Sequence, residues 1–304
     1  MKLGFVSAIL DGWTFEEMMD TAAGLGYECV EAACWPQGKA ERRYAGVSHI
    51  DVDNDSRGYV AHIHETCKKT GVEISALAYY PNTMDGDFQK REAAIRHLKK
   101  VIAFSEKLGI GMVTTFVGRD QTKSVEENLE AFGRIWPPII RYAEEHGVRI
   151  AIENCPMLFG REQWPGGHNL FTSPALWRKM FDMIPSRNFG INYDPSHFVW
   201  QMMDYIQPIY EFRERIFHVH YKDIKVYPQK LKDVGIMAYP LEYMEPKLPG
   251  LGDVDWGRYV SALTDIGYDG FTCVEVEDRA FEADRERILD SLKLSKRYIE
   301  QFVI

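Results

Sequence analysis

The sequence lacks the features expected of membrane proteins and of proteins that bind nucleic acids. No apolar stretch approaches the roughly 20 residues that a membrane-spanning helix needs, and the start, Met1–Val6, is too short for a signal peptide. The formal net charge is -9, and no run of lysine and arginine is long enough to form a basic face for phosphate groups. We therefore expect neither a membrane nor a nucleic acid as a partner.

Cysteine pairs and nucleotide-binding glycine motifs are missing as well. The five cysteines show no CxxC or other paired spacing, and each lies in or beside an apolar run. This usage is typical of reduced thiols in the core of a cytoplasmic protein. Gly109 and Gly111 are not followed by the glycines of a dinucleotide site, and no phosphate-binding loop occurs. We therefore expect no nucleotide cofactor.

A helical pattern that ends on a glycine and leads at once into a short β-branched run recurs along the chain. The junctions lie at Gly26, Gly71, Gly109, Gly147 and Gly267. A helix often ends in a left-handed residue, which glycine adopts without a steric clash of a Cβ atom. A strand that begins only a few residues later is the short connection typical of α/β folds.

Eight strand patterns alternate with eight helical patterns. The strands are expected near residues 3–7, 28–33, 72–78, 111–117, 148–154, 189–194, 215–221 and 271–276. The helices are expected near residues 14–25, 58–70, 87–108, 125–146, 173–183, 203–213, 255–266 and 282–302. Eight such units in a chain of 304 residues, with no shift in composition, predict a fold of the α/β class. We expect a single (β/α)8 TIM barrel that forms one domain over residues 1–304.

Two of the connections are longer than usual. One follows the second strand, from Trp35 to about Arg57, and the other follows the seventh strand, from Ile224 to about Asp253. Both leave the carboxyl ends of strands, where barrels of this kind build their sites. We interpret the second as an ordered lid because it is rich in tyrosine and leaves through a Pro-Gly-Leu-Gly-Asp segment.

Four expected strands in a row end in a side chain that binds metals. These side chains are Glu153, Asp194, His220 and Glu275. Taken singly, a glutamate at a strand end is more often a salt-bridge partner and a histidine more often a core residue. Together, charged groups at the ends of four successive buried strands are costly unless something compensates them. Three carboxylates and one imidazole suit one divalent cation, so we predict a metal site at the barrel mouth.

Residues next to these four are candidates for substrate contacts. His197 lies three residues after Asp194 and could bind the metal, bind a substrate hydroxyl, or cap the following helix. Lys222 is a candidate electrophile for a substrate oxygen, with a solvated lysine as the alternative. Glu277 has the same periodicity as Glu275 but lies beyond the apolar run, so it ranks second as a ligand.

Other candidates follow from position alone. Trp35 and Tyr80 follow the second and third strands and are expected to contact the substrate as walls of the pocket. Glu31 ends the second strand and is expected to contribute to the same wall. His218 lies one layer deeper than His220, so a supporting or packing role is expected.

Five segments together resemble the xylose isomerase-like barrel superfamily, and within it the sugar phosphate isomerase/epimerase group with its ketose 3-epimerases and inosose-processing enzymes. These segments are Glu153-Asn154, Tyr193–His197, His218–Asp223, Pro249–Trp256 and Glu275–Asp278. The resemblance implies that Glu153, Asp194, His220 and Glu275 bind Mn2+, with Mg2+ or Co2+ as alternatives. It also implies that His197 contacts a small carbohydrate and that the two glutamates form a catalytic acid/base pair.

The residues fit removal of a proton next to a carbonyl, through an enediolate whose charge the ion stabilises. Return of the proton to the opposite face gives an epimer, and return to the adjacent carbon gives an isomer. Loss of a β-substituent instead gives dehydration or glycoside cleavage. We therefore expect an isomerase or epimerase of a ketose or keto-sugar derivative. The alternative is a lyase or dehydratase acting on a keto-sugar or 3-keto-glycoside.

A phosphodiesterase of the apurinic endonuclease type is the competitor from another class. It needs histidines at the ends of the third and fourth strands, where this chain has Tyr79-Tyr80 and Thr114-Thr115. The acidic composition also argues against DNA as a substrate. The natural substrate and assembly into a homo-oligomer stay open.

Overall fold

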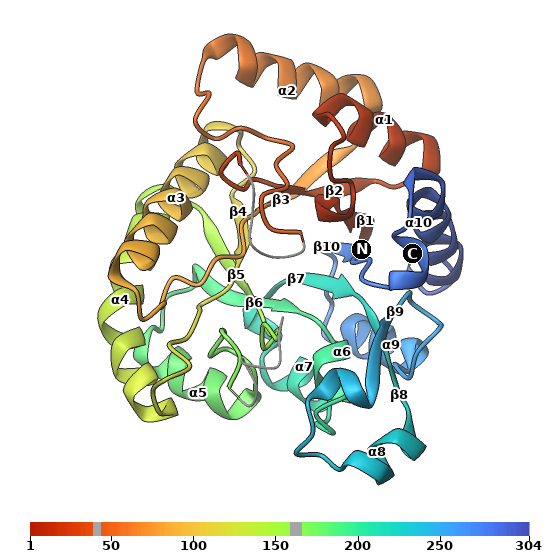
Figure 1. The fold of residues 1–304 in the computed structure, drawn as a ribbon. Helices are drawn as coiled ribbons and strands as arrows, with labels where there is room; N and C mark the ends of the chain where they lie inside the picture. Colours follow the sequence, from red (N-terminus) through yellow and green to blue (C-terminus); the bar gives the residue numbers. More distant parts are fainter. Residues whose placement is uncertain (39–43, 159–165, 304) are drawn as a thin grey trace.

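Eight parallel strands of the described chain close into a barrel (Figure 1). The computed structural model describes residues 1–38, 44–158 and 166–303. The strands are β1 (Lys2–Val6), β2 (Cys29–Ala33), β3 (Glu73–Ala78), β4 (Met112–Thr115), β5 (Arg149–Glu153), β6 (Phe189–Tyr193), β7 (Ile216–Tyr221) and β10 (Phe271–Val274). They pair in the order β1-β10-β7-β6-β5-β4-β3-β2, and β1 closes the ring on β2. The predicted (β/α)8 barrel is confirmed.

Helices surround the barrel and connect successive strands (Figure 1). The longer ones are α1 (Phe15–Leu25), α2 (Arg57–Thr70), α3 (Phe88–Lys107), α4 (Val125–Glu145), α5 (Pro174–Met183), α9 (Trp256–Asp265) and α10 (Arg285–Ile299). Side-chain caps stabilise the starts of these helices except α5; Thr14 and Ser124, for example, each form a reciprocal pair with a glutamate three residues later. The five junction glycines all have positive φ, as their pattern predicts.

The sixth helical segment differs from the prediction. A continuous helix near residues 203–213 was expected, but the chain forms the short α6 (Ser196–Val199), then α7 (Gln207–Glu211) and a 3-10 turn. Asp204 Oδ1 accepts hydrogen bonds from the backbone N–H groups of Ile206 and Gln207, which stabilises a turn where a helix would begin. Local turn chemistry therefore outweighs the helical periodicity of this segment.

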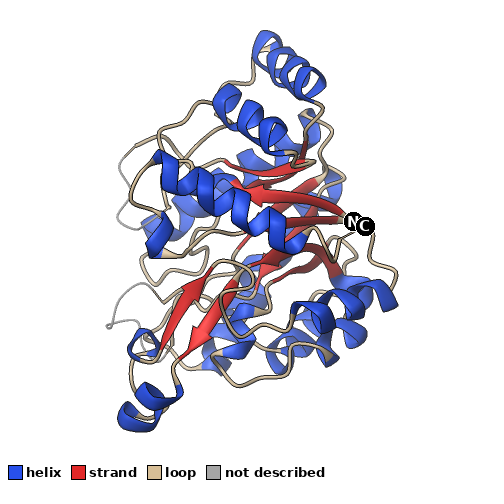
Figure 2. Ribbon diagram, turned by 90° about the vertical axis from the view of Figure 1, so that its right-hand side faces the viewer, coloured by secondary structure: helices blue, strands red, loops and turns tan. Residues whose placement is uncertain are grey.

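An ordered arm replaces a simple loop after β7. It contains β8 (Asp223–Val226), α8 (Pro228–Val234) and β9 (Met244–Lys247), and β8 and β9 pair antiparallel. Figures 1 and 2 show the arm extending from one side of the barrel. Trp200, Ile224, Tyr243 and Met244 form a buried apolar cluster between the arm and the segment after α6. The long connection thus contains regular secondary structure, and a role as a lid stays a prediction.

The base of the arm is fixed by the buried carboxylate of Asp223. Its oxygens accept from the N–H groups of Gly250 (2.9 Å) and Val254 (3.1 Å) and from the indole N–H of Trp256 (2.9 Å). The backbone at Gly252 passes very close to the Asp223 carboxylate. A Cβ added at Gly252 would lie 2.3 Å from Asp223 Oδ1. The Pro-Gly-Leu-Gly-Asp exit therefore requires glycine for its close approach to Asp223.

The composition led to expectations about membrane-spanning helices and about the cysteines. In the described part of the chain, no helix is long and apolar enough to cross a membrane. Cys29, Cys34 and Cys273 are buried free thiols, as predicted, whereas Cys67 and Cys155 are free thiols that are only partly buried. The long connection after β2 includes residues 39–43, which lie outside the described residues.

Candidate metal centre

The four predicted ligand residues meet at the carboxyl end of the barrel. Glu153 is the last residue of β5 and His220 lies near the end of β7, whereas Asp194 and Glu275 directly follow β6 and β10. Each offers one ligand atom, and the four atoms lie within 4.8 Å of one another. Glu153, Asp194 and His220 are buried, and the side chain of Glu275 is 17% exposed. The closed barrel brings these strand ends together without any special loop.

Three atoms of this group have no hydrogen-bond partner among the described residues. They are Glu153 Oε1, Asp194 Oδ2 and His220 Nδ1, all buried. Buried polar atoms in folded proteins almost always have a partner. Lys222 Nζ forms ion pairs with Asp194 Oδ2 (3.1 Å) and Glu153 Oε1 (3.7 Å), and the convergence of the three atoms leaves them available to a further group. Three carboxylates and an imidazole form a mostly oxygen donor set that suits Mn2+, Mg2+ or Co2+. The residues present therefore fit a divalent cation.

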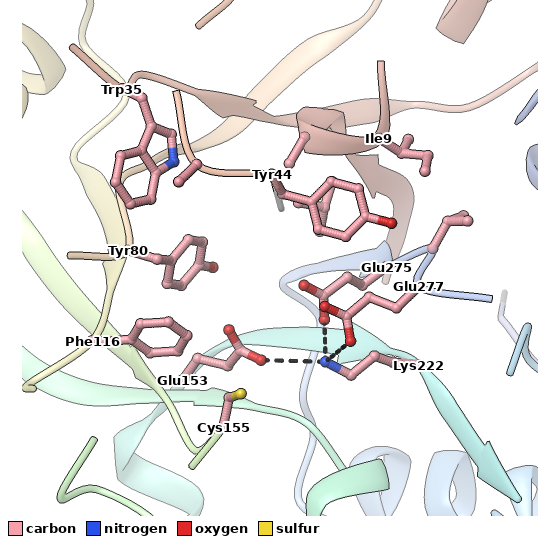
Figure 3. Close-up of a pocket in the computed structure, with 14 residues that line it drawn as sticks. Ile9, Trp35, Tyr44, Tyr80, Phe116, Glu153, Cys155, Lys222, Glu275 and Glu277 are labelled. Carbon is pink, nitrogen blue, oxygen red and sulfur yellow. Dashed lines mark hydrogen bonds and ion pairs between the residues drawn. The ribbon is translucent and has the colours of Figure 1, made fainter. Parts of the chain in front are cut away.

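Lys222 lies beside the candidate ligands as a buried cation (Figure 3). Its Nζ is 2.6 Å from Glu275 Oε2, 3.1 Å from Asp194 Oδ2, 3.4 Å from Glu277 Oε2 and 3.7 Å from Glu153 Oε1. Burial lowers the pKa of Lys222, but the surrounding carboxylates outweigh burial and hold the pKa well above its usual value. The alternative of a solvated lysine is wrong.

The two candidate catalytic glutamates differ in electrostatic surroundings. Burial raises the pKa of Glu153, but the charge of Lys222 and the neighbouring imidazoles of His197 and His220 outweigh it and hold this pKa well below its usual range. Burial, together with the neighbouring carboxylates Glu153 and Glu277, raises the pKa of Glu275 despite the nearby Lys222. Pairs of carboxyl groups whose pKa values are pushed apart are typical of acid/base sites.

His197 is buried next to the ligand group. Its Nε2 lies 3.5 Å from Glu153 Oε1 and 3.4 Å from Asp194 Oδ2. It is part of α6, so the turn after Asp194 carries it back over the barrel mouth. Its Nε2 makes no hydrogen bond with the residues that the structure describes, so this atom could contact a ligand.

The role of Glu31 could not be derived from its position in the sequence. Its carboxylate lies behind the ligand group, with Oε2 2.7 Å from His220 Nε2. Oε1 accepts from Tyr80 Oη (2.5 Å) and Thr114 Oγ1 (2.7 Å). Burial raises the pKa of Glu31, but His220 and the other donors outweigh it and lower the pKa to about 2. Glu31 supports a ligand rather than forming a plain wall of the pocket.

Two connected cavities lie in front of these residues. The inner one, of about 70 Å3, is lined by Trp35, Tyr80, Phe116 and the candidate ligands Glu153 and Glu275 (Figure 3). The outer one, of about 630 Å3, lies between the barrel mouth and the arm. Its lining residues include His197, Trp200, Met244, Lys247 and Arg279. The cavities share Lys222 and Glu277 among their lining residues. The predicted substrate contacts each line at least one of the two cavities: Trp35, Tyr80, His197 and Lys222.

The family follows from a match over most of the chain. Residues 19–298 match the model of the xylose isomerase-like TIM barrel. The chain belongs to this family.

Known proteins similar to this family member include characterised enzymes. It is 24% identical to the uncharacterised protein YfiH of Bacillus subtilis, over 99% of this chain and 100% of that protein. It is 23% identical to the inosose dehydratase of Lactiplantibacillus plantarum, over 72% of each chain. Among solved structures, the IolI protein with a bound zinc atom has a TM-score of 0.72 at 18% identity, over 99% of both chains. The D-psicose 3-epimerase of Clostridium cellulolyticum H10 has a TM-score of 0.68 at 15% identity, over 100% of this chain and 99% of that one.

Proposed function

We propose that this protein is a divalent-metal-dependent isomerase or epimerase of a ketose or keto-sugar derivative. The observation that carries the proposal is the convergence of Glu153, Asp194, His220 and Glu275, three of which present a buried atom that makes no hydrogen bond to any described residue. These four residues would hold Mn2+, with Mg2+ or Co2+ as alternatives. A bound divalent cation supplies stabilisation of negative charge that develops on a substrate carbonyl oxygen. The epimerase and zinc-binding structures of the same fold support this assignment.

The chain's own residues would move the proton. Glu153 and Glu275 approach the site from different strands, so one carboxylate can take the proton from the carbon next to the carbonyl and the other can return a proton. Delivery to the opposite face of the same carbon yields an epimer, and exchange with solvent resets both carboxyl groups. His197 and Lys222 donate hydrogen bonds to substrate oxygens.

The pocket walls would orient the sugar and exclude water. Trp35, Tyr80 and Phe116 line the inner cavity on the side facing Glu153 (Figure 3). Aromatic rings bind the apolar face of a sugar ring while its hydroxyl groups point toward polar partners. Exclusion of water by a bound sugar would strengthen each electrostatic contact made in the inner cavity. We expect this activity in the cytoplasm, on a small carbohydrate substrate.

A lyase or dehydratase is the second candidate, and the outer cavity favours it. A volume of about 630 Å3 between the mouth and the arm leaves room for a leaving group beyond a single sugar ring. The substrate in this case is a keto-sugar or a 3-keto-glycoside, which loses water or an aglycone after proton removal. The inosose dehydratases among the relatives support this alternative.

Mass spectrometry of substrates incubated with the Mn2+-loaded protein in D2O tests the proposal. The panel contains free ketoses and 3-keto-glycosides, and the control is the variant Asp194→Asn under the same conditions. Deuterium in the recovered or epimeric sugar supports the isomerase or epimerase. Loss of water or of an aglycone supports the lyase. If neither product forms, and the control gives the same result, both activities are contradicted for the substrates tested.

A further inference from the structure

Glu31 is a fully buried carboxylate whose two oxygens are both engaged. Tyr80 Oη and Thr114 Oγ1 donate to Oε1, at 2.5 and 2.7 Å. His220 Nε2 lies 2.7 Å from Oε2. Glu31 lies on β2, on the opposite side of the His220 ring from the candidate ligands. The carboxylate therefore contacts one ligand residue from behind.

The contact between Glu31 and His220 decides which ring nitrogen carries a hydrogen. An ionised carboxylate only accepts hydrogen bonds, so His220 Nε2 must be the donor. The lone pair of a neutral imidazole is then on Nδ1. This atom lies 3.5 Å from Glu275 Oε2 and 3.8 Å from Glu153 Oε1, among the candidate ligands.

The amide of Asn192 is the competing partner of His220 Nε2. Its terminal group lies 2.9 Å from Nε2, and with the nitrogen facing His220 it would need an unprotonated Nε2. That arrangement would place the Nε2 lone pair against the negative Oε2 of Glu31 at 2.7 Å with no hydrogen between them. The full charge and the shorter distance favour Glu31, so the amide presents its oxygen to His220.

The deeper residues agree with this orientation of Asn192. The Ser75 hydroxyl donates to the carbonyl of Val30, so it accepts from His218 Nε2 at 3.1 Å. His218 Nδ1 is then an acceptor, and it lies 3.0 Å from the Asn192 amide, which must present its nitrogen there. Turning the amide in this way gives up only its 3.1 Å donation to Tyr80, the longest of its three contacts.

The same hydrogen bonds exclude a second metal at this place. Glu31, His218 and His220 lie close enough to form a ligand group. However, both oxygens of Glu31 accept from donors, and both ring nitrogens of His218 have partners. An ion there would have to break hydrogen bonds that are already formed, whereas His220 Nδ1 makes no hydrogen bond to any described residue.

We propose that Glu31 is a positioning residue that fixes the tautomer and ring orientation of His220 and so makes Nδ1 the metal-binding nitrogen. The inference rests on the proposed metal-dependent function. A carboxylate that accepts the second N–H of a histidine ligand also raises the basicity of the ligand nitrogen. Glu31 acts through His220 and does not reach the substrate, because Tyr80 and Thr114 cover its other oxygen.

The variant Glu31→Gln tests the proposal because it preserves size and removes the charge. Its amide can turn a nitrogen toward His220 and invert the tautomer. We expect Mn2+ binding, measured by titration calorimetry, to weaken about 10- to 100-fold. Asp223→Asn is the matched control, since Asp223 is a buried, hydrogen-bonded carboxylate at the base of the arm. The control is expected to lose stability without loss of Mn2+ affinity.

A spectroscopic measurement separates positioning from general damage. In 15N-labelled, Zn2+-loaded protein, the His220 Nε2–H signal should persist in slow exchange and should vanish or shift in Glu31→Gln. Thr114→Val removes one donor to Glu31 while keeping the side-chain shape, so it should weaken Mn2+ binding by a smaller factor. Thr114→Val keeps the test usable if Glu31→Gln does not fold.

Two outcomes overturn the proposal. Unchanged Mn2+ affinity in folded Glu31→Gln, or an equal loss in Asp223→Asn, shows that Glu31 does not position the ligand. For a Glu31→Gln variant that does not fold, unchanged affinity in Thr114→Val has the same meaning. Failure of the wild-type protein to bind Mn2+ at all instead contradicts the proposed function.

Discussion

Glu153 and Glu275 face the same lysine, but the pKa of Glu153 is held below its usual range and that of Glu275 is raised, which gives a prediction at the scale of single residues. Replacing either glutamate by glutamine should lower turnover about 10²- to 10⁴-fold, because the amide cannot take or return a proton. Glu277→Gln is the matched control, since Glu277 also contacts Lys222, at 3.4 Å, but lies outside the four-residue group. Turnover and Mn2+ content are measured together. Full activity of Glu153→Gln or Glu275→Gln at full Mn2+ occupancy would disprove the acid/base assignment.

Lys222 gives a second prediction, in which binding and catalysis change in opposite directions. Lys222→Met keeps the length of the side chain and removes a positive charge that lies about 3 Å from two candidate ligands. Mn2+ affinity should rise by roughly tenfold or more because the ammonium no longer repels the ion. Turnover should fall because the hydrogen-bond donor to the substrate is lost.

Calorimetry and steady-state kinetics measure the two effects of Lys222→Met separately. Lys225→Met, a change at an exposed lysine of the arm, is the control and should alter neither quantity. Weaker Mn2+ binding in Lys222→Met would mean that the lysine stabilises the ligand group rather than competing with the ion.

The convergence of the candidate ligands was easier to predict from the sequence than the residues that support them. Glu153, Asp194, His220 and Glu275 follow from strand periodicity because each lies at, near or directly after the end of a barrel strand. The surroundings of Lys222 and the hydrogen bonds of Glu31 depend on side chains from several strands. Contacts between side chains of different strands cannot be derived from a single sequence. The burial of Lys222 and Glu31 and the charges around them could therefore not be predicted from residue spacing.

At the scale of elements, the glycine junctions were predictable because a left-handed helix end is a local property. The five junction glycines have positive φ, and the strands after them lie where expected. The broken helix near residues 203–213 was not predicted, because the Asp204 turn competes with a helical pattern of similar strength. The strands β8 and β9 were also missed, since their pairing depends on how the arm folds back.

The base of the arm gives a prediction at this scale. Gly252→Ala would place a Cβ 2.3 Å from Asp223 Oδ1 and 2.4 Å from the Ile224 carbonyl oxygen. We expect a loss of about 1–3 kcal/mol in the free energy of unfolding and faster hydrogen exchange in β8 and β9. Gly24→Ala in α1 is the control, because no atom lies within 4 Å of the added Cβ, and it should be neutral or stabilising. Equal exchange in β8 and β9 for both variants would refute the role of this contact.

At the scale of the whole molecule, a bound ion should raise the melting temperature, and the rise should depend on pH. Free Mn2+ at 100 times its Kd stabilises the fold by about 2.7 kcal/mol, which corresponds to a Tm increase of about 5 °C for a chain of this size. Burial lowers the pKa of His220, but Glu31, Glu153 and Glu275 outweigh it and raise the pKa well above 6.5 in the metal-free protein. Mn2+ must therefore displace a proton, so its affinity falls as the pH falls.

The stability of the metal-free protein changes with pH in the opposite direction. A raised pKa of His220 stabilises the fold below the unfolded pKa, and this contribution is lost as the pH rises through the folded pKa. The difference in Tm between Mn2+-loaded and EDTA-treated protein should therefore widen from pH 5.5 to pH 8, and scanning calorimetry measures it. Asp194→Asn should show a much smaller difference at each pH. An equal shift in that variant, or a shift without pH dependence, would place the ion on the acidic surface of a chain with net charge -9 rather than at the barrel mouth.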